Sequence, residues 1–194
     1  MKRLLALLPL LLCLISARAQ DTENPYTFKG IPIQGTTDNF IKQLVSQGFK
    51  IIKNNSPLQK NFSKDCLLGT FFNRYVTILL SENSPNYING VYILLDTDNL
   101  DSTISSYKDV RNGLNTKYGN SKDFIFFDTK SIEGKSLSEI KRELVSGETF
   151  SAGIAHKKQD SNLLYISLVL SYGITTLTYM NPQIINTYNY YNDL

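Results

Sequence analysis

The pattern of apolar and polar positions predicts three amphipathic helices, because apolar residues recur there at spacings of three and four. Their stripes are Phe40, Ile41, Leu44 and Val45; Ile104, Tyr107, Val110, Arg111, Leu114 and Tyr118; and Leu137, Ile140 and Leu144. Gly48, Gly119 and Gly147 follow the three stripes, and glycine is common where a helix ends. We expect Gly119 to adopt the left-handed conformation of such a cap.

Each predicted helix is preceded by residues that can cap it. The N-cap of the first helix is Thr36 or Thr37, with Asp38 in the first turn, and that of the second helix is Asp101 or Ser102. The N-cap of the third helix is Ser136, which is expected to form a capping box with Glu139. Gly113 lies inside the second helix, where glycine is less favourable than alanine by about 1 kcal/mol. We therefore expect a packing reason for Gly113.

Between the helices the pattern changes to short runs that are rich in β-branched and aromatic residues, as expected of strands. The runs are "FKII", "CLLGTFF", "YVTILLS", "GVYILLDT", "DFIFFD", "TFSAGIAHKK", "NLLYISLVLS" and "GITTLTYM". Asn73–Arg74 and "SYG" predict tight turns, and residues 82–89 predict a loop. Because most runs follow one another without a helix between them, we predict an α+β domain with an antiparallel sheet and about three helices on one face.

Two segments of the chain resemble each other. "FIKQLVSQGF" and "EIKRELVSGETF" are both predicted short helices that continue into a strand. This similarity suggests a two-repeat architecture, in which each half is one helix followed by three or four antiparallel strands. The specific variant that we expect resembles the β-lactamase inhibitor proteins.

Residues 1–19 are typical of an export signal. "MKR" is basic, "LLALLPLLLCLIS" is apolar, and "ARA" precedes a cleavage point after Ala19. The apolar run is too short for a membrane span. We therefore expect a cleaved signal peptide over 1–19, no transmembrane segment, and a single domain over 20–194. Cys13 follows Leu12 instead of a small residue, so lipid anchoring is not expected.

Removal of the predicted signal peptide changes the charge of the chain. The whole chain has 20 basic and 17 acidic residues, and Lys2, Arg3 and Arg18 lie in the signal peptide, so 17 of each sign remain. A net charge of zero gives no electrostatic reason to expect nucleic acid as a partner. Cys66 is then the single cysteine, which favours the periplasm or envelope of a Gram-negative bacterium over a disulfide-rich secreted module.

The stretch "GIPIQGTT", Gly30–Thr37, has nearly the spacing of a phosphate-binding loop. However, Thr36 stands in place of the lysine, and Pro32 removes one backbone N–H donor. We interpret the two glycines as turn residues, the two isoleucines as a short buried extended segment, and the threonines as caps.

Catalytic and metal-binding candidates are few. His156 is the single histidine, and Cys66 lies in a predicted strand as a small buried hydrophobe. A calcium site could form from three nearby aspartates, Asp96, Asp98 and Asp101, but their spacing does not fit an EF-hand loop. Among the 17 acids the sequence selects no pair for glycoside hydrolysis. We therefore predict no catalytic residue, no metal and no cofactor, with the three aspartates as an alternative calcium site.

The last group of candidates is tyrosine: Tyr172, Tyr179, Tyr188, Tyr190 and Tyr191. Tyrosine suits recognition of proteins or sugars, although it is also common in strands. Our hypothesis is a non-catalytic exported protein that binds another macromolecule, protein or glycan, through the exposed sheet face or this tyrosine-rich end. An envelope glycan hydrolase and a periplasmic protein that binds a small molecule are the alternatives. The oligomeric state stays open.

The strings "FKGIPIQGTTDNFIKQLVSQGFK", "LLGTFFNRYVTILL", "GVYILLDT" and "YKDVRNGLNTKYG" resemble uncharacterised secreted proteins of gut Bacteroidetes. The similarity extends roughly from Phe28 to Gly119. It implies a periplasmic or envelope location and an α+β fold, and it implies no particular activity.

Overall fold

The computed structural model describes residues 26–53, 62–63, 65–95, 99–156 and 164–181. Its helices are α2 (Thr37–Ser46), α3 (Leu100–Tyr118) and α4 (Leu137–Val145). Its strands are β1 (Thr27–Phe28), β2 (Ile31–Pro32), β3 (Lys50–Lys53), β4 (Asp65–Phe71), β5 (Arg74–Ser84), β6 (Tyr87–Leu95), β7 (Phe124–Lys130), β8 (Phe150–His156), β9 (Leu164–Ser171) and β10 (Ile174–Met180).

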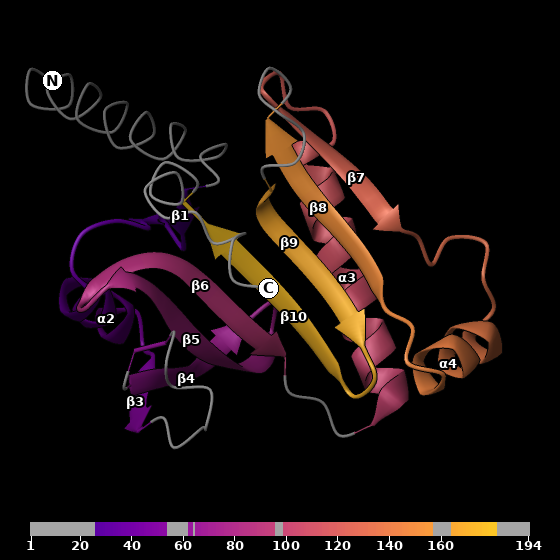
Figure 1. Ribbon diagram of the computed structural model, residues 1–194, viewed down its shortest axis with the longest axis horizontal. Coiled ribbons are helices and arrows are strands. Elements are labelled where there is room, and N and C mark those ends of the chain that lie inside the picture. The colour runs from indigo at the N-terminus through magenta and orange to yellow at the C-terminus, as the bar shows by residue number, and fades with distance from the viewer. Residues whose placement is uncertain (1–25, 54–61, 64, 96–98, 157–163, 182–194) are drawn as a thin grey trace, which may run out of the picture.

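Eight strands form one antiparallel sheet in the order β3-β4-β5-β6-β10-β9-β8-β7. Strands β3 to β6 are sheet neighbours in chain order, and so are β7 to β10, so two meanders meet where β6 pairs with β10. Strands β1 and β2 form a separate two-stranded hairpin. Figure 1 shows the first meander in purple and magenta and the second in orange and yellow. The predicted α+β fold with an antiparallel sheet is confirmed.

One face of the sheet carries the hydrophobic core. Leu67, Ile78, Ile93, Leu177 and Leu168 are successive register partners across five strands, and all are fully buried. Residues of α2, α3 and α4 belong to the same buried cluster, and α3 lies behind the second meander in Figure 1. Burial of one face is the usual arrangement of an antiparallel sheet. No helix within the described ranges is long and apolar enough to cross a membrane.

The predicted helix stripes are buried, with two exceptions. Val45 and Leu137 are 41% and 45% exposed, and they lie near the ends of α2 and α4. The capping box of α4 is present as predicted. Hydrogen bonds from the hydroxyl and backbone N–H of Ser136 lower the pKa of the Glu139 carboxyl.

Gly119 ends α3 as predicted, but the predicted N-cap and the predicted conformation of Gly119 were wrong. The N-cap is Asn99, whose side chain accepts a hydrogen bond from the Ser102 N–H at 2.9 Å, because the helix begins earlier than the polar residues suggested. Gly119 has φ −59° and ψ −31°, which is right-handed. Its N–H donates to the Asn115 carbonyl at 2.7 Å, so Gly119 continues the helical turn instead of reversing it.

Two turns also differ from the prediction. The β4–β5 turn consists of Phe72 and Asn73, one residue earlier than expected, and both have positive φ. The predicted loop over 82–89 is mostly strand, with only Pro85 and Asn86 between β5 and β6. Polar residues can occupy these strand ends because one face of the sheet is not covered by the core.

The sheet has two halves of the predicted kind, but the two helices that resemble each other in sequence are not the equivalent ones. Helices α2 and α3 each precede the first strand of a meander, whereas α4 lies between β7 and β8. The sequence similarity joins α2 to α4, which do not occupy equivalent positions. The halves correspond as one helix plus four strands, with α4 as an addition to the second half.

Candidate functional site

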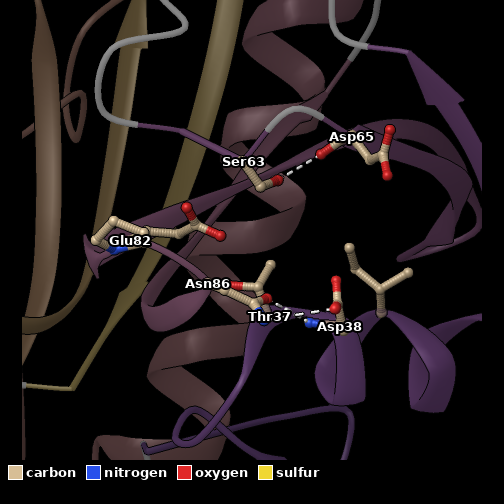
Figure 2. A pocket seen from close by; sticks show the side chains of 8 residues that line it. Thr37, Asp38, Ser63, Asp65, Glu82 and Asn86 are labelled. Carbon is tan, nitrogen blue, oxygen red and sulfur yellow. Dashed lines mark hydrogen bonds between the residues drawn. The ribbon is translucent and has the colours of Figure 1, made fainter.

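A cavity of about 350 Å³ lies between the start of α2 and the β5–β6 hairpin. We call it the acidic pocket, and its lining consists of Thr37, Asp38, Ile41, Ser63, Asp65, Glu82, Pro85 and Asn86. Figure 2 shows the carboxyl groups of Asp38, Asp65 and Glu82 around one space, each on a different segment of the chain.

Backbone hydrogen bonds hold the hairpin turn against the start of α2. The Thr37 N–H donates to the Asn86 carbonyl at 3.0 Å, and the Ile88 N–H donates to the Gly35 carbonyl at 3.1 Å. Gly35 has φ +79°, which glycine adopts without strain, so the chain can turn directly before the helix. The stretch 30–37 therefore forms a turn and a capped helix start, as predicted, with its two isoleucines buried.

Side-chain hydrogen bonds and a bulge position the acids. The Asn86 side-chain oxygen accepts from the Asp38 backbone N–H at 3.3 Å, and its amide nitrogen donates to the Asp38 carboxylate at 3.4 Å. Glu82 lies where the pairing of β5 with β6 shifts register on both sides, and such a bulge redirects a side chain. The Ser63 N–H donates to the Leu80 carbonyl at 2.8 Å, which ties the segment before β4 to β5.

The carboxylates of the acidic pocket have no cationic partner in the described part of the chain. The ion pairs formed there do not include Asp38, Asp65 or Glu82. No three Asp, Glu, His or Cys side chains of the described residues lie close enough to hold one metal ion. The arrangement therefore suits an ammonium or guanidinium group, whose several N–H donors can reach separate carboxylates.

Thr37 distinguishes this cavity from an ordinary acidic surface. Its side chain lines the pocket, the residue is only 2% exposed, and its hydroxyl has no hydrogen-bond partner among the described residues. A buried hydroxyl without a partner is unfavourable by about 1–3 kcal/mol.

The predicted tyrosine cluster does not form a common surface within the described residues. Tyr172 is 65% exposed in the β9–β10 turn, whereas Tyr179 is 8% exposed in the core, and the two lie toward opposite ends of β10. Burial raises the pKa of the Tyr179 hydroxyl. Tyr188, Tyr190 and Tyr191 lie outside the described residues.

The other candidates are scattered. Asp96 and Asp98 lie outside the described residues, and Asp101 in α3 forms an ion pair with Lys141 at 2.6 Å. Cys66 is buried in β4 as predicted, and burial raises the pKa of its thiol. The backbone of His156 ends β8, where it pairs with Phe124.

The sequence identified three residues of the acidic pocket for other roles, with Thr37 as a cap candidate and Ile41 in the apolar stripe of the first helix. Asp38 was expected to complement the helix dipole, whereas Ser63, Asp65, Glu82 and Asn86 were not singled out. Their separation along the chain gives no pattern that periodicity can detect. The one usable indication is the Pro-Asn dipeptide at 85–86, which marks a turn.

Comparison with known proteins gives no match: no family model, no curated relative and no solved structure is similar to this chain. The likeness to the β-lactamase inhibitor proteins and to secreted Bacteroidetes proteins therefore stays a prediction.

Proposed function

We propose that this protein is an exported, non-catalytic binding protein whose acidic pocket takes a lysine or arginine side chain of a partner protein in the cell envelope. The observation that carries the proposal is that Asp38, Asp65 and Glu82 line one cavity, without a cation from the described residues beside them.

An exposed aromatic residue beside the pocket supports a protein partner. Tyr87 directly follows Asn86 of the pocket lining and is 52% exposed. Tyrosine and arginine are enriched among the few interface residues that contribute most of the binding free energy. An arginine in the pocket and a contact on Tyr87 would together form the centre of such an interface.

The setting of the acids favours binding over catalysis. A general acid in a glycosidase needs an apolar environment that keeps its carboxyl protonated. Asp38 is exposed, and Asp65 and Glu82 are half-buried among polar side chains. None of the three has the apolar enclosure that proton donation at neutral pH requires.

The experiment titrates the protein with a short blocked arginine peptide and with its citrulline counterpart, which is similar in shape but uncharged. Amide chemical shifts in NMR spectra report the contact. We expect the arginine peptide, at millimolar concentration, to shift the signals of Thr37, Asp38, Glu82 and Asn86. The citrulline peptide should leave them in place, and added salt should weaken the effect.

The variant Asp65→Asn/Glu82→Gln should lower the affinity for the arginine peptide about tenfold or more, which corresponds to about 1.4 kcal/mol. Asp109→Asn is the matched control, because it removes an acid whose ion pair with Arg74 lies elsewhere. Equal binding of both peptides, or no effect of the pocket variant, would contradict the proposal.

A glycan hydrolase is the second candidate, because three carboxylates line one cavity and such enzymes use a pair of them. Incubation with cell-wall glycan fragments and measurement of released reducing ends tests it. Activity that Glu82→Gln abolishes would replace the binding proposal, whereas no release of reducing ends would contradict the hydrolase.

A further inference from the structure

A second cavity, of about 240 Å³, lies where the β1–β2 turn, the β4–β5 turn and α3 meet. We call it the aromatic pocket, and the residues that matter for its chemistry are Lys29, Phe71, Phe72, Gly113, Lys117 and Tyr179. It shares no lining residue with the acidic pocket. A ligand of the aromatic pocket would therefore be additional to the proposed function and independent of it.

The first unusual feature of the aromatic pocket is the backbone of its two turns. Each turn has two residues, and all four have positive φ: Lys29 (51°), Gly30 (77°), Phe72 (50°) and Asn73 (57°). Turns of this kind strongly prefer asparagine, aspartate or glycine at their first position. Lysine and phenylalanine there are disfavoured, and both side chains line the same cavity.

The second unusual feature is Gly113, and it supplies the packing reason that the sequence called for. A Cβ atom at this position would lie 2.7 Å from the Cε1 atom of Phe72. The helix therefore lacks a side chain where the Phe72 ring approaches it. Phe72 nevertheless stays 42% exposed, so its ring forms a wall of the cavity and is not simply a core residue.

Three local rules are thus broken at one place: at Lys29, at Phe72 and at Gly113. Departures from local preference are expected at functional sites, because elsewhere nothing offsets their unfavourable free energy. Their convergence on one cavity indicates a ligand site better than any of them does alone.

The lining defines the ligand. Phe71, Phe72 and Tyr179 supply aromatic walls. The ammonium groups of Lys29 and Lys117 lie 5.4 Å and 5.0 Å from the ring centroids of Phe49 and Tyr118, respectively. A ring face holds an ammonium group in place and leaves its formal charge intact.

We propose that the aromatic pocket binds a small organic anion with a flat apolar body, of the chemical class of an aromatic carboxylate. The rings would pack on the apolar body, and the ammonium group of Lys29 would pair with the carboxylate. The cavity is smaller than most drug-sized sites, which limits the ligand to one or two rings.

The probe is 4-fluorophenylacetate, and the matched neutral compound is 4-fluorophenylacetamide. Binding to the full chain is followed by ¹⁹F NMR line broadening and by calorimetry. We expect the carboxylate to bind at least tenfold more tightly than the amide. Equal affinities, or no binding of the carboxylate at millimolar concentration, would overturn the proposal.

Lys29→Asn is the decisive variant. Asparagine suits the first position of this turn, so the variant should melt at a higher temperature than the wild type. It should also bind the carboxylate at least fivefold more weakly, and a loss of binding in a more stable protein cannot result from unfolding. Unchanged affinity would overturn the proposal.

Lys42→Gln is the control, because it removes one positive charge from the exposed face of α2. It should leave the affinity for the probe unchanged. An equal loss in both lysine variants would show that the probe responds only to overall charge, which would also overturn the proposal.

Discussion

In the half of the molecule built on α3 and β7, acids near the core have cations beside them. Arg111 is buried and forms a two-pronged ion pair with Asp128, and its guanidinium also bonds Glu133 at 2.7 Å. The hydrogen bonds that Arg111 donates to Asp128 raise the pKa of Arg111 above its ordinary value. Lys135 similarly pairs with Glu143 at 2.7 Å.

In the half built on α2 and the first meander, the acidic pocket gathers Asp38, Asp65 and Glu82 without an ion pair to a described residue. The fold neutralises the charges that its own packing requires, as at Asp128. The acids of the acidic pocket are not neutralised in this way, so the difference between the two regions separates ion-paired acids from those whose charge is available to a partner.

The largest expected effect comes from breaking the buried ion pair. Arg111→Met leaves the Asp128 carboxylate without its main partner, and their side chains are only 8% and 16% exposed. We expect the free energy of unfolding to fall by about 3–5 kcal/mol, measured by urea denaturation. Arg111→Met/Asp128→Leu should recover most of the loss, since neither charge remains.

Glu133→Gln is the control for that variant. The Glu133 side chain is 70% exposed, so its loss should change the stability by about 0.5 kcal/mol or less. A similarly small effect of Arg111→Met would mean that the two regions do not differ in the way that the geometry indicates.

Two buried helix threonines sharpen the comparison. The Thr103 hydroxyl donates to the Asn99 carbonyl at 3.0 Å, whereas the Thr37 hydroxyl has no partner in the described part of the chain. Thr103→Val should lower the free energy of unfolding by about 1 kcal/mol, and Thr37→Val should raise it by about 1 kcal/mol. Thermal and urea unfolding of both variants measure the difference, and a loss at both positions would contradict it.

A smaller effect is expected when the acidic pocket itself is neutralised. Asp65→Asn/Glu82→Gln removes like-charge repulsion and leaves Asp38 to complement the dipole of α2. We expect an increase in stability of about 0.5 kcal/mol at low salt that disappears near 1 M salt, where charges are screened. A loss of stability at low salt would mean that these acids have a structural partner.

The smallest effect concerns an exposed acid whose pKa is shifted by its own helix cap. Because hydrogen bonds from Ser136 lower the pKa of Glu139 in the folded state, the cap stabilises the protein above the ordinary pKa of glutamate. This stability is lost as the pH falls through the lowered value. Glu139→Gln keeps a capping side chain and should reduce the acid dependence of the melting temperature, and an unchanged pH profile would contradict this.

The secondary structure was largely predictable because its signals are local. The stripe from Ile104 to Tyr118 and the capping box at Ser136 depend on residues within a few turns of one another, and both were identified correctly. The left-handed end expected at Gly119 failed, because glycine permits that conformation without imposing it.

The acidic pocket was not predictable from the sequence. Its members come from α2, the start of β4 and the β5–β6 hairpin, and the strand register together with the hydrogen bonds between the hairpin turn and α2 brings them to one cavity. Register depends on pairing between distant strands, which no window of the sequence contains. The aromatic pocket was predictable in one respect, because the sequence singled out Gly113 as an unusual residue inside a helix.

The pairing of the two meanders through β6 and β10 has a consequence for how the chain folds. The central pair of strands, β6 and β10, aligns Ile93 with Leu177, which are 84 positions apart. Contacts between such distant residues form late, because a long loop must close first. Until the last described strand has been synthesised and docked, β6 presents an unpaired edge that can join a strand of another molecule. The middle of the sheet is therefore its last part to close, and a chain shortened before β10 would keep that edge open to aggregation.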